Sequence, residues 1–163
     1  MRRLSLEPIG QIRSAFADAE GTPIQPAYAN GAEGRVVVDA AWAEALDDID
    51  GFERIWLLYW MDRVGEARVK VVPYRDDRER GLLATRSPCR PNPIGLSAVR
   101  LVRREGNVLH VADLDVLDGT PLLDIKPYVP AFDAHAVSRA GWLDLTTSDR
   151  RVADTRFHDP AGT

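Results

Sequence analysis

The stretch "IGLSAVRLVRREGNVLHVADLDVL" (residues 94–117) decides the fold, because it holds two strand-like runs around one turn signal. In the first run apolar residues alternate with polar ones, which is typical of a β-strand with one buried face. The letters "REGN" (residues 104–107) combine glycine with asparagine, and both residues favour the tight turn of a hairpin. We therefore expect two antiparallel strands here, with further strands pairing on either side.

Further strands are expected both before and after this hairpin. Those that precede it cover residues 9–16, 35–39, 54–61, 67–74 and 81–86. The segment 54–61, "RIWLLYWM", is rich in aromatic and aliphatic residues and lacks polar alternation. Such a run is typical of a strand that is buried on both faces.

One helix is expected, at residues 39–52, "DAAWAEALDDIDGF". Asp39 is a candidate N-cap, because its side chain can accept a hydrogen bond from a free backbone N–H of the first turn. Gly51 is a typical helix stop signal. Three tryptophans are expected in the core rather than on a base-stacking surface: Trp42, Trp56 and Trp60.

Many short strands with a single helix predict a mainly β domain. We expect a small single-domain β-barrel, or a strongly curled sheet, with one main helix and long loops. The chain of 163 residues suits one domain, which is expected at residues 1–145. Residues 146–163 are polar and are expected to form a loosely held tail. Residues 20–34, rich in glycine and proline, are expected to form a long loop, and such loops are often functional.

Composition excludes several classes of protein. Cys89 is the only cysteine, so neither a disulfide scaffold nor a cysteine-based zinc site is expected. No apolar run approaches the ~20 residues of a membrane span, and the N-terminal residues lack the apolar core of a signal peptide. A free thiol without a signal peptide fits a cytoplasmic protein. We expect no membrane association and no metal ion.

Charge is distributed unevenly along the chain, although the formal net charge is only −4. Residues 39–62 contain seven acidic side chains and one basic one, whereas residues 63–90 contain eight basic and four acidic ones. The total argues against a general binder of polyanions, but a local basic surface can still hold a phosphate backbone. An ordinary solvated, mixed-charge surface is the alternative.

The segment "RSPCRPNPIGLS" (residues 86–97) is unusually stiff and positively charged. Each of its three prolines fixes φ and restricts the residue before it, so a helix is excluded. Arg86 and Arg90 could donate hydrogen bonds to a phosphate or a carboxylate. Gly95 would let another group approach the backbone closely. The residues alone leave two interpretations open, a preorganised binding site and a rigid structural corner.

The segment "LDVLDGTPLLDIKPY" (residues 114–128) places carboxylates in an otherwise apolar setting. Buried charge is costly unless it is paired, so Asp115, Asp118 and Asp124 require an explanation. Lys126 or an arginine could pair with them, Asp118 could simply form the turn at "DG", or they could accept hydrogen bonds from a ligand. The spacing gives only weak support for a divalent metal.

The remaining signals are weaker. Gln25, in the proline-bracketed "TPIQP" of the long loop, carries both a donor and an acceptor and suits an adenine edge or an amide. No GxGxxG, P-loop or GxSxG motif is present, so the usual signatures of Rossmann, P-loop and α/β-hydrolase folds are missing. The histidines are scattered and are expected to be structural or surface residues: His110, His135 and His158.

Two long blocks, "ATRSPCRPNPIGLSAV" and "DLDVLDGTPLLDIKPYVP", closely resemble the TrmO family, also called YaeB- or TsaA-like. "IGQIRSAF", "TPIQP" and "LDDIDGFERIWLLYW" match earlier blocks of that family in the same order, so the resemblance covers about residues 6–145. It implies an S-adenosylmethionine-dependent methyltransferase acting on N6-threonylcarbamoyladenosine beside the tRNA anticodon. It also implies a small β-barrel and a homodimer whose cofactor site lies near the subunit interface.

The resemblance also implies roles for individual residues. The implied cofactor-binding positions are Gln25, Pro26, Asp62, Arg63, Arg86, Leu96, Asp118, Gly119, Thr120 and Pro121. Arg90, Asn92 and Lys126 lie in the same motifs and are expected at the site or on the tRNA surface. Asp62 is a departure, because many relatives carry histidine there.

Methyl transfer from a sulfonium requires alignment of donor and acceptor and exclusion of water. A carboxylate such as Asp62 or Asp118 could favour the cationic donor, and Asp118 is our expected general base for the N6 proton. The basic segment 63–90 would receive the anticodon stem-loop. Two alternatives are a non-enzymatic β-barrel that binds RNA or a nucleotide, and a metal-dependent hydrolase that uses Asp115, Asp118 and Asp124.

Overall fold

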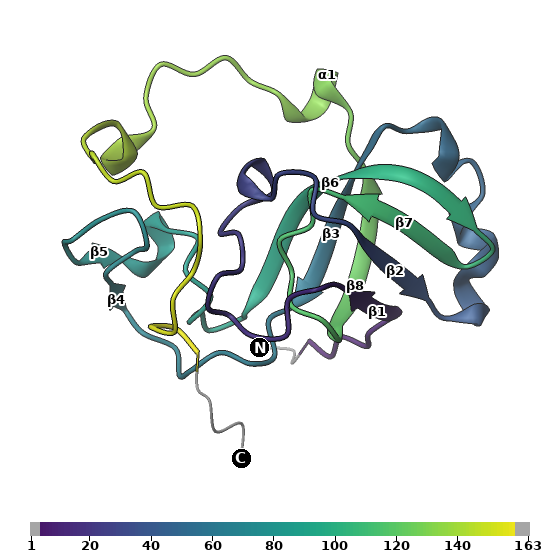
Figure 1. Cartoon of the computed structure of the whole chain (residues 1–163), viewed down its shortest axis with the longest axis horizontal. Helices are drawn as coiled ribbons and strands as arrows, with labels where there is room; N and C mark the ends of the chain where they lie inside the picture. The colour runs from purple at the N-terminus through teal and green to yellow at the C-terminus, as the bar shows by residue number, and fades with distance from the viewer. Residues whose placement is uncertain (1–3, 159–163) are drawn as a thin grey trace.

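Six antiparallel strands close into a barrel in the computed structural model of the chain, which describes residues 4–158 (Figure 1). The strand order around the barrel is β1-β2-β7-β6-β3-β8. The strands are β1 (Gly10–Arg13), β2 (Gly34–Val38), β3 (Arg54–Trp60), β6 (Ile94–Glu105), β7 (Val108–Ala112) and β8 (Thr120–Pro127). The prediction of a small, mainly β barrel is therefore confirmed.

The hairpin predicted at the centre of the sequence is confirmed as β6 and β7. Glu105 pairs with Val108, so the turn consists of two residues, Gly106 and Asn107. Gly106 has φ +61°, the left-handed conformation that glycine adopts without a steric penalty. The Asn107 side chain donates to the Val38 carbonyl oxygen at 2.5 Å, which ties the turn to β2.

Strand β3 lies between β6 and β8 and is buried on only one face. Ile55, Leu57 and Tyr59 point into the barrel, whereas Trp60 is 47% exposed. The expectation of burial on both faces was wrong, because within residues 4–158 the outward-facing side chains of β3 are only partly covered. Trp56 is partly exposed as well and packs its ring against Tyr128, with centroids 5.5 Å apart.

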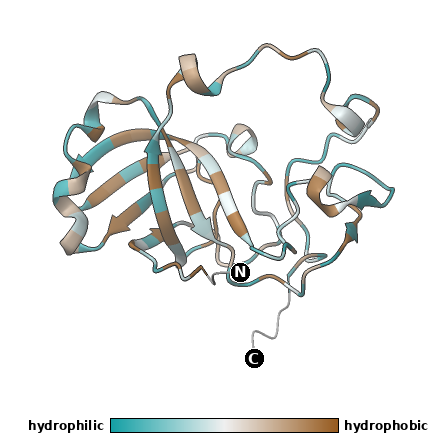
Figure 2. Ribbon diagram, turned by 180° about the vertical axis from the view of Figure 1, so that it is seen from behind, coloured by the Kyte–Doolittle hydropathy of each residue, from teal (hydrophilic) through white to brown (hydrophobic). Residues whose placement is uncertain are grey.

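The core fills the barrel with aliphatic side chains from every strand. Figure 2 shows hydrophobic and hydrophilic residues alternating along these strands, as period-two burial requires. The largest fully buried core side chains of the barrel are Ile12, Ile55, Leu57, Leu109, Leu114 and Leu122. Hydrophobic burial of this kind is the main stabilising term of the fold.

The segment predicted as the main helix forms two short 3₁₀ helices instead, η2 (Ala40–Leu46) and η3 (Ile49–Gly51). Asp48 separates them in a left-handed conformation, with φ +67°. Leu46 is the only buried residue of the two elements, so little packing favours a longer α-helix. Trp42 is 53% exposed, so its assignment to the core was wrong. The α-helix that the structure does describe, α1 (Pro130–Asp133), is four residues long.

A small lobe beside the barrel replaces the strands expected at residues 67–74 and 81–86 (Figure 1). Only β4 (Lys70–Val71) and β5 (Arg80–Gly81) pair there, and the 3₁₀ helix η4 (Leu82–Ala84) follows. Cys89 and Phe157 are buried with Val71 and Leu82 in a core of the lobe's own. The lobe is therefore built from segments that are far apart in the sequence.

The C-terminal segment packs against the lobe and the N-terminal loop. Val152 pairs with Pro23, His158 pairs with Val64, and Phe157 is only 2% exposed. The expectation of a loosely held tail was therefore wrong for residues 146–158, and residues 159–163 lie outside the described part. The domain boundary at residue 145 stays a prediction.

Candidate functional site

A cavity of about 330 Å³ opens where the barrel meets the lobe and the long N-terminal loop. Strands β3 and β6 supply Tyr59 and Leu96, the N-terminal loop supplies Gln25, and the C-terminal segment supplies His158. Its volume lies in the usual range of small-molecule sites. Because it brings together residues from the barrel, the long loop, the proline-rich stretch and the C-terminal segment, this cavity is the candidate functional site.

Most of the predicted site residues lie around this one cavity. Those that line it are Gln25, Asp62, Arg63, Arg86, Arg90, Leu96 and Thr120. They come from four separate parts of the sequence, so their assembly depends on the folded chain. Resemblance of short motifs alone could not establish that these residues meet.

Hydrogen bonds join these segments across the cavity. Arg86 Nη1 donates to Gln25 Oε1 at 2.6 Å, which links the proline-rich stretch to the N-terminal loop. Arg63 Nη2 donates to Thr120 Oγ1 at 3.0 Å, which links the end of β3 to the start of β8. These charge-assisted bonds hold the walls of the cavity in a defined position.

Two carboxylates and three guanidinium groups give the cavity a mixed charge: Asp62, Asp115, Arg63, Arg86 and Arg90. Arg63 Nε lies 3.4 Å from Asp62 Oδ1, a long and partly exposed ion pair. Arg86 also lines two adjoining cavities, one with Pro26 and Trp56 and the other on the lobe side. The Arg86–Gln25 pair therefore forms a wall that three cavities share.

Four residues expected at the cofactor site do not line the main cavity: Pro26, Asp118, Gly119 and Pro121. The Asp118 carboxylate accepts from Ser14 N at 3.0 Å and pairs with Arg13 at 3.4 Å, on the outer side of β1. Gly119 has φ +80° and supplies the turn before β8. The role of Asp118 as the base stays a prediction, but its carboxylate faces away from the cavity.

The residues expected to contact tRNA occupy different places. Arg90 Nη1 donates to the carbonyl oxygens of Thr85 and Ser87, at 2.8 and 3.4 Å, so it braces the proline-rich stretch. Lys126 pairs with Asp124 at 2.9 Å and lies outside the cavity. Asn92 also lies outside it. Binding of tRNA by these residues stays a prediction.

Asp115 lines the cavity, although the sequence placed it among unexplained carboxylates and not among the expected cofactor positions. Ser97 Oγ donates to Asp115 Oδ1 at 2.6 Å, and the Tyr59 hydroxyl lies 3.0 Å from the same Ser97 oxygen. Burial raises the pKa of the Asp115 carboxyl to about 7, while the Ser97 hydrogen bond and the Arg86 cation oppose that shift. The signal was a carboxylate between the apolar residues Leu114 and Val116.

Gly95 makes room for Tyr59. A Cβ atom at Gly95 would lie 2.0 Å from the Tyr59 ring, since the two residues face each other across β6 and β3. The proline-rich stretch was expected to need glycine so that a ligand could approach, but this position admits the Tyr59 side chain. Burial raises the pKa of Tyr59 far above its usual range, so the hydroxyl stays a hydrogen-bond donor.

His158 reaches the cavity from the C-terminal segment. Burial, together with the Arg63 cation, lowers the pKa of its imidazole, which favours the neutral form. Its Nδ1 atom is buried and has no hydrogen-bond partner among the described residues. The expectation that His158 is a structural or surface residue therefore missed its position in the cavity wall.

Within residues 4–158, no group of three or more histidine, cysteine or acidic side chains is arranged to hold a metal ion. No helix in the same range is long and apolar enough to cross a membrane.

The fold and the cavity define a small ligand-binding β-barrel, distinct from nucleotide-binding folds with a parallel sheet. Residues 11–134 match the family of the tRNA-methyltransferase O N-terminal domain, and the chain belongs to that family. The resemblance noted in the sequence is thereby confirmed.

Known relatives span archaea, bacteria and mammals. A probable S-adenosyl-L-methionine-binding protein of Pyrococcus abyssi is 50% identical, over 92% of this chain and 83% of its own. A tRNA (adenine(37)-N6)-methyltransferase of Rattus norvegicus is 33% identical, over 89% of this chain and 38% of its own. The crystal structure of TrmO from Pseudomonas aeruginosa matches with a TM-score of 0.72 and 38% identity, over 86% of this chain and 62% of that one.

The relatives differ greatly in length. This chain spans most of the Pyrococcus protein but less than two thirds of the Pseudomonas enzyme and of the mammalian one. The activity of the longer enzymes is accordingly a proposal for this chain.

Proposed function

We propose that this protein is an S-adenosylmethionine-dependent methyltransferase that modifies the N6 nitrogen of adenosine 37 in tRNA, with N6-threonylcarbamoyladenosine as its substrate. The observation that carries the proposal is the convergence of the family's motif residues on one cavity, where Gln25 meets Arg86 and Arg63 meets Thr120. The relatives, which include an S-adenosyl-L-methionine-binding protein and tRNA (adenine(37)-N6)-methyltransferases, support both halves of it.

The residues of the cavity fit S-adenosylmethionine chemically. Its sulfonium supplies an electrophilic methyl group, and the displacement needs no metal or covalent enzyme intermediate. The Asp62 carboxylate suits the cationic part of such a donor, while Arg63 and Arg86 suit its carboxylate. Apolar side chains, among them Leu96 and Val116, would cover the rest and exclude water.

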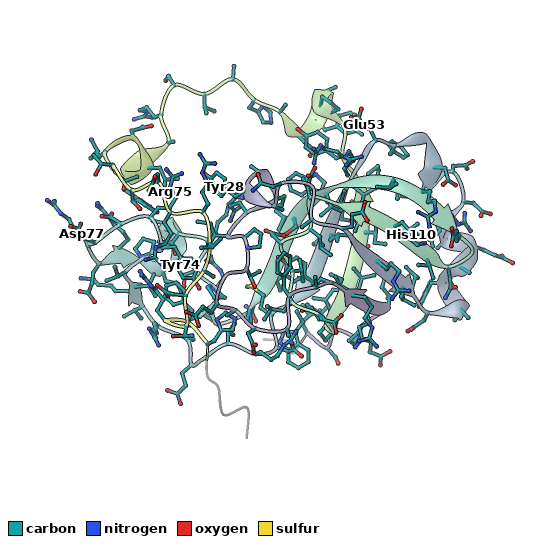
Figure 3. All side chains as sticks on the ribbon, viewed as in Figure 1. Tyr28, Glu53, Tyr74, Arg75, Asp77 and His110 are labelled. Carbon is teal, nitrogen blue, oxygen red and sulfur yellow. The ribbon has the colours of Figure 1, made fainter. Side chains whose placement is uncertain are left out.

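The surface next to the cavity suits a single-stranded RNA loop. Arg75 lies 5.8 Å from the centroid of the Tyr28 ring and donates to the Tyr28 hydroxyl at 2.7 Å, as can be followed in Figure 3. Aromatic rings and guanidinium planes are typical partners of unstacked bases. A target base must leave its stack to reach an enclosed cavity, which favours the anticodon loop over a duplex.

Calorimetry with S-adenosylmethionine and S-adenosylhomocysteine tests the first half of this proposal. Binding of both at a 1:1 ratio is expected, and Arg86→Ala should weaken it because the contact with Gln25 is lost. Glu33→Gln, a change on the exposed N-terminal loop outside the cavity, serves as the control. If the protein binds RNA but neither of these compounds, it is a binding module and not a methyltransferase.

Mass spectrometry of tRNA nucleosides tests the second half. Cells that lack this protein should lose the methylated form of threonylcarbamoyladenosine, and the gene supplied in trans should restore it. Persistence of the methylated nucleoside in the deletion strain would contradict the substrate assignment but leave methyl transfer to another acceptor open.

We also propose a homodimer located in the cytoplasm. Ile94 and Leu96, which line the cavity, and Trp60, which pairs with Ile94, are each more than 40% exposed, and a second copy could cover this apolar patch. The free, buried Cys89 is compatible with a reducing compartment. Light scattering with wild-type protein and Trp60→Glu checks the dimer, and a monomeric wild type at micromolar concentration would contradict it.

A further inference from the structure

Asp115 is the carboxylate of the cavity that the proposed binding of the methyl donor leaves without a role. It lies between Leu114, which is fully buried, and Val116, which is 3% exposed. Its own side chain remains partly accessible from the cavity. Burial without a countercharge in contact is costly for a carboxylate, and proteins usually retain such an arrangement for a purpose.

The hydrogen bonds around Asp115 form a chain that runs in one direction. The Tyr59 hydroxyl can donate to Ser97 Oγ, which donates to Asp115 Oδ1. Each donor is fixed in place, because Ser97 is 1% exposed and the Tyr59 ring is enclosed against Gly95. Among the described residues no other side chain bonds to this carboxylate, so Oδ2 is left for a ligand in the cavity.

We infer that Asp115 is the general base of the proposed methyl transfer, accepting the proton of the substrate nitrogen on Oδ2 while Ser97 and Tyr59 hold the carboxylate in position. This inference rests on the proposed function. In the balanced step, the bond from methyl carbon to sulfur breaks and a bond from the same carbon to N6 forms. The N6–H bond breaks and its proton passes to Asp115, so a sulfonium and a carboxylate become a thioether and a carboxylic acid.

The other carboxylates near the site are less suitable as the base. Asp62 already pairs with Arg63, at 3.4 Å, and suits the cationic donor instead. Asp118 is held by Ser14 and Arg13 on the outer side of the barrel. The charged or titratable groups that face Asp115 are Tyr59 from β3 and Arg86 from the proline-rich stretch. Asp115 is therefore the carboxylate best placed to take up a proton inside the cavity.

The principal experiment compares wild type with Asp115→Asn in single-turnover methylation of tRNA that carries threonylcarbamoyladenosine. General-base catalysis contributes about 100- to 10,000-fold, so a loss of that size is expected. Calorimetric affinity for S-adenosylhomocysteine should remain within about threefold, because the amide keeps the shape and the Ser97 hydrogen bond. Asp47→Asn, an exposed carboxylate paired with Arg104, is the matched control and should keep the wild-type rate.

A second experiment examines the positioning role of Ser97 in the free protein. ¹³C NMR of the aspartate carboxyl groups should contain one signal that titrates near neutral pH and is missing from Asp115→Asn. Ser97→Ala removes the donor to Asp115 Oδ1, so the midpoint of that signal should move to higher pH, and the midpoint of the pH–rate profile should move with it. If Asp115 is not the base, the carboxyl midpoint should move in Ser97→Ala while the midpoint of the pH–rate profile stays unchanged.

The possible outcomes separate the two proposals. If wild type methylates the tRNA and Asp115→Asn keeps its rate within about threefold, the base is not Asp115 but the function stands. If wild type neither binds the donor nor methylates, both proposals fail. If Asp115→Asn does not fold, Ser97→Ala decides, and an unchanged midpoint of its pH–rate profile overturns the inference.

Discussion

At the scale of the residue, the cavity depends on close contacts between a few residues. Four residues from three segments of the chain form a series in which each contacts the next: Gly95, Tyr59, Ser97 and Asp115. The glycine lacks a side chain so that the tyrosine ring can occupy its place. The tyrosine in turn fixes the serine, and the serine fixes the carboxylate.

Asp115→Asn should change how stability depends on pH. In the folded protein the pKa of Asp115 is about 7, against an ordinary value of 3.8, so the native state holds a proton that the unfolded chain releases in between. The stabilisation from this group is complete below pH ~4 and is lost as pH rises through about 7. Asparagine cannot ionise, so the variant should gain stability relative to wild type over that window, by at most roughly 4 kcal/mol.

Urea denaturation of both proteins between pH 4 and pH 8 measures this difference. Other groups titrate equally in the two proteins, so the difference isolates Asp115. Parallel stability curves would show that the folded-state pKa of Asp115 is ordinary.

Gly95→Ala should destabilise the barrel by about 1–3 kcal/mol, because the new Cβ overlaps the Tyr59 ring and one of the two must move. Gly51→Ala is the matched control, since a Cβ there meets no atom within 4 Å. Chemical denaturation measures both variants. Equal stability of the two would mean that Tyr59 can leave its position at no cost.

At the scale of the element, β6 is both a strand of the barrel and part of the cavity wall. Its hairpin with β7 follows from period-two alternation and a glycine-containing turn, which are local signals. Its start, at Ile94, follows the prolines that fix the direction of the chain into the cavity. The helix expected at residues 39–52 failed for the opposite reason, since helix propensity had no buried face to support it.

Phe157→Ala should loosen the C-terminal segment while the barrel stays folded. Phe157 is 2% exposed and packs edge-on against Tyr74, with ring centroids 5.0 Å apart. Loss of a buried phenylalanine lowers stability by about 3–5 kcal/mol. We expect this loss to exceed the free energy that holds the short C-terminal segment against the rest of the fold. Hydrogen exchange should accelerate in residues 146–158 and remain slow in β3 and β6.

Phe132→Ala provides the control, because Phe132 is 73% exposed on α1. Donor affinity should fall in Phe157→Ala but not in Phe132→Ala, since His158 and Ala153 of the loosened segment line the cavity. Uniformly faster exchange throughout the barrel would show instead that the segment and the barrel unfold together.

At the scale of the whole molecule, the sequence predicted the barrel and six of the ten expected cofactor positions as cavity-lining residues. Motif resemblance could supply these six positions because each motif is a continuous stretch of the sequence. The positions of Asp115 and His158 in the cavity wall were not predicted because they depend on non-local contacts, a hydrogen bond with Ser97 for one and a bridge to Val64 for the other. Trp42 and Trp60 were misassigned because a small closed barrel leaves much apolar surface on its outside.

The buried thiol of Cys89 has a practical consequence. Its Sγ donates to the Phe157 carbonyl oxygen at 3.4 Å, so the C-terminal segment shields the chain's single cysteine from reagents. Labelling by a thiol reagent should therefore report each opening of that segment without any engineered probe. Because that segment also forms part of the cavity wall, a bound ligand should slow the labelling in proportion to its occupancy. Labelling kinetics would therefore measure how strongly a bound ligand suppresses opening of the C-terminal segment.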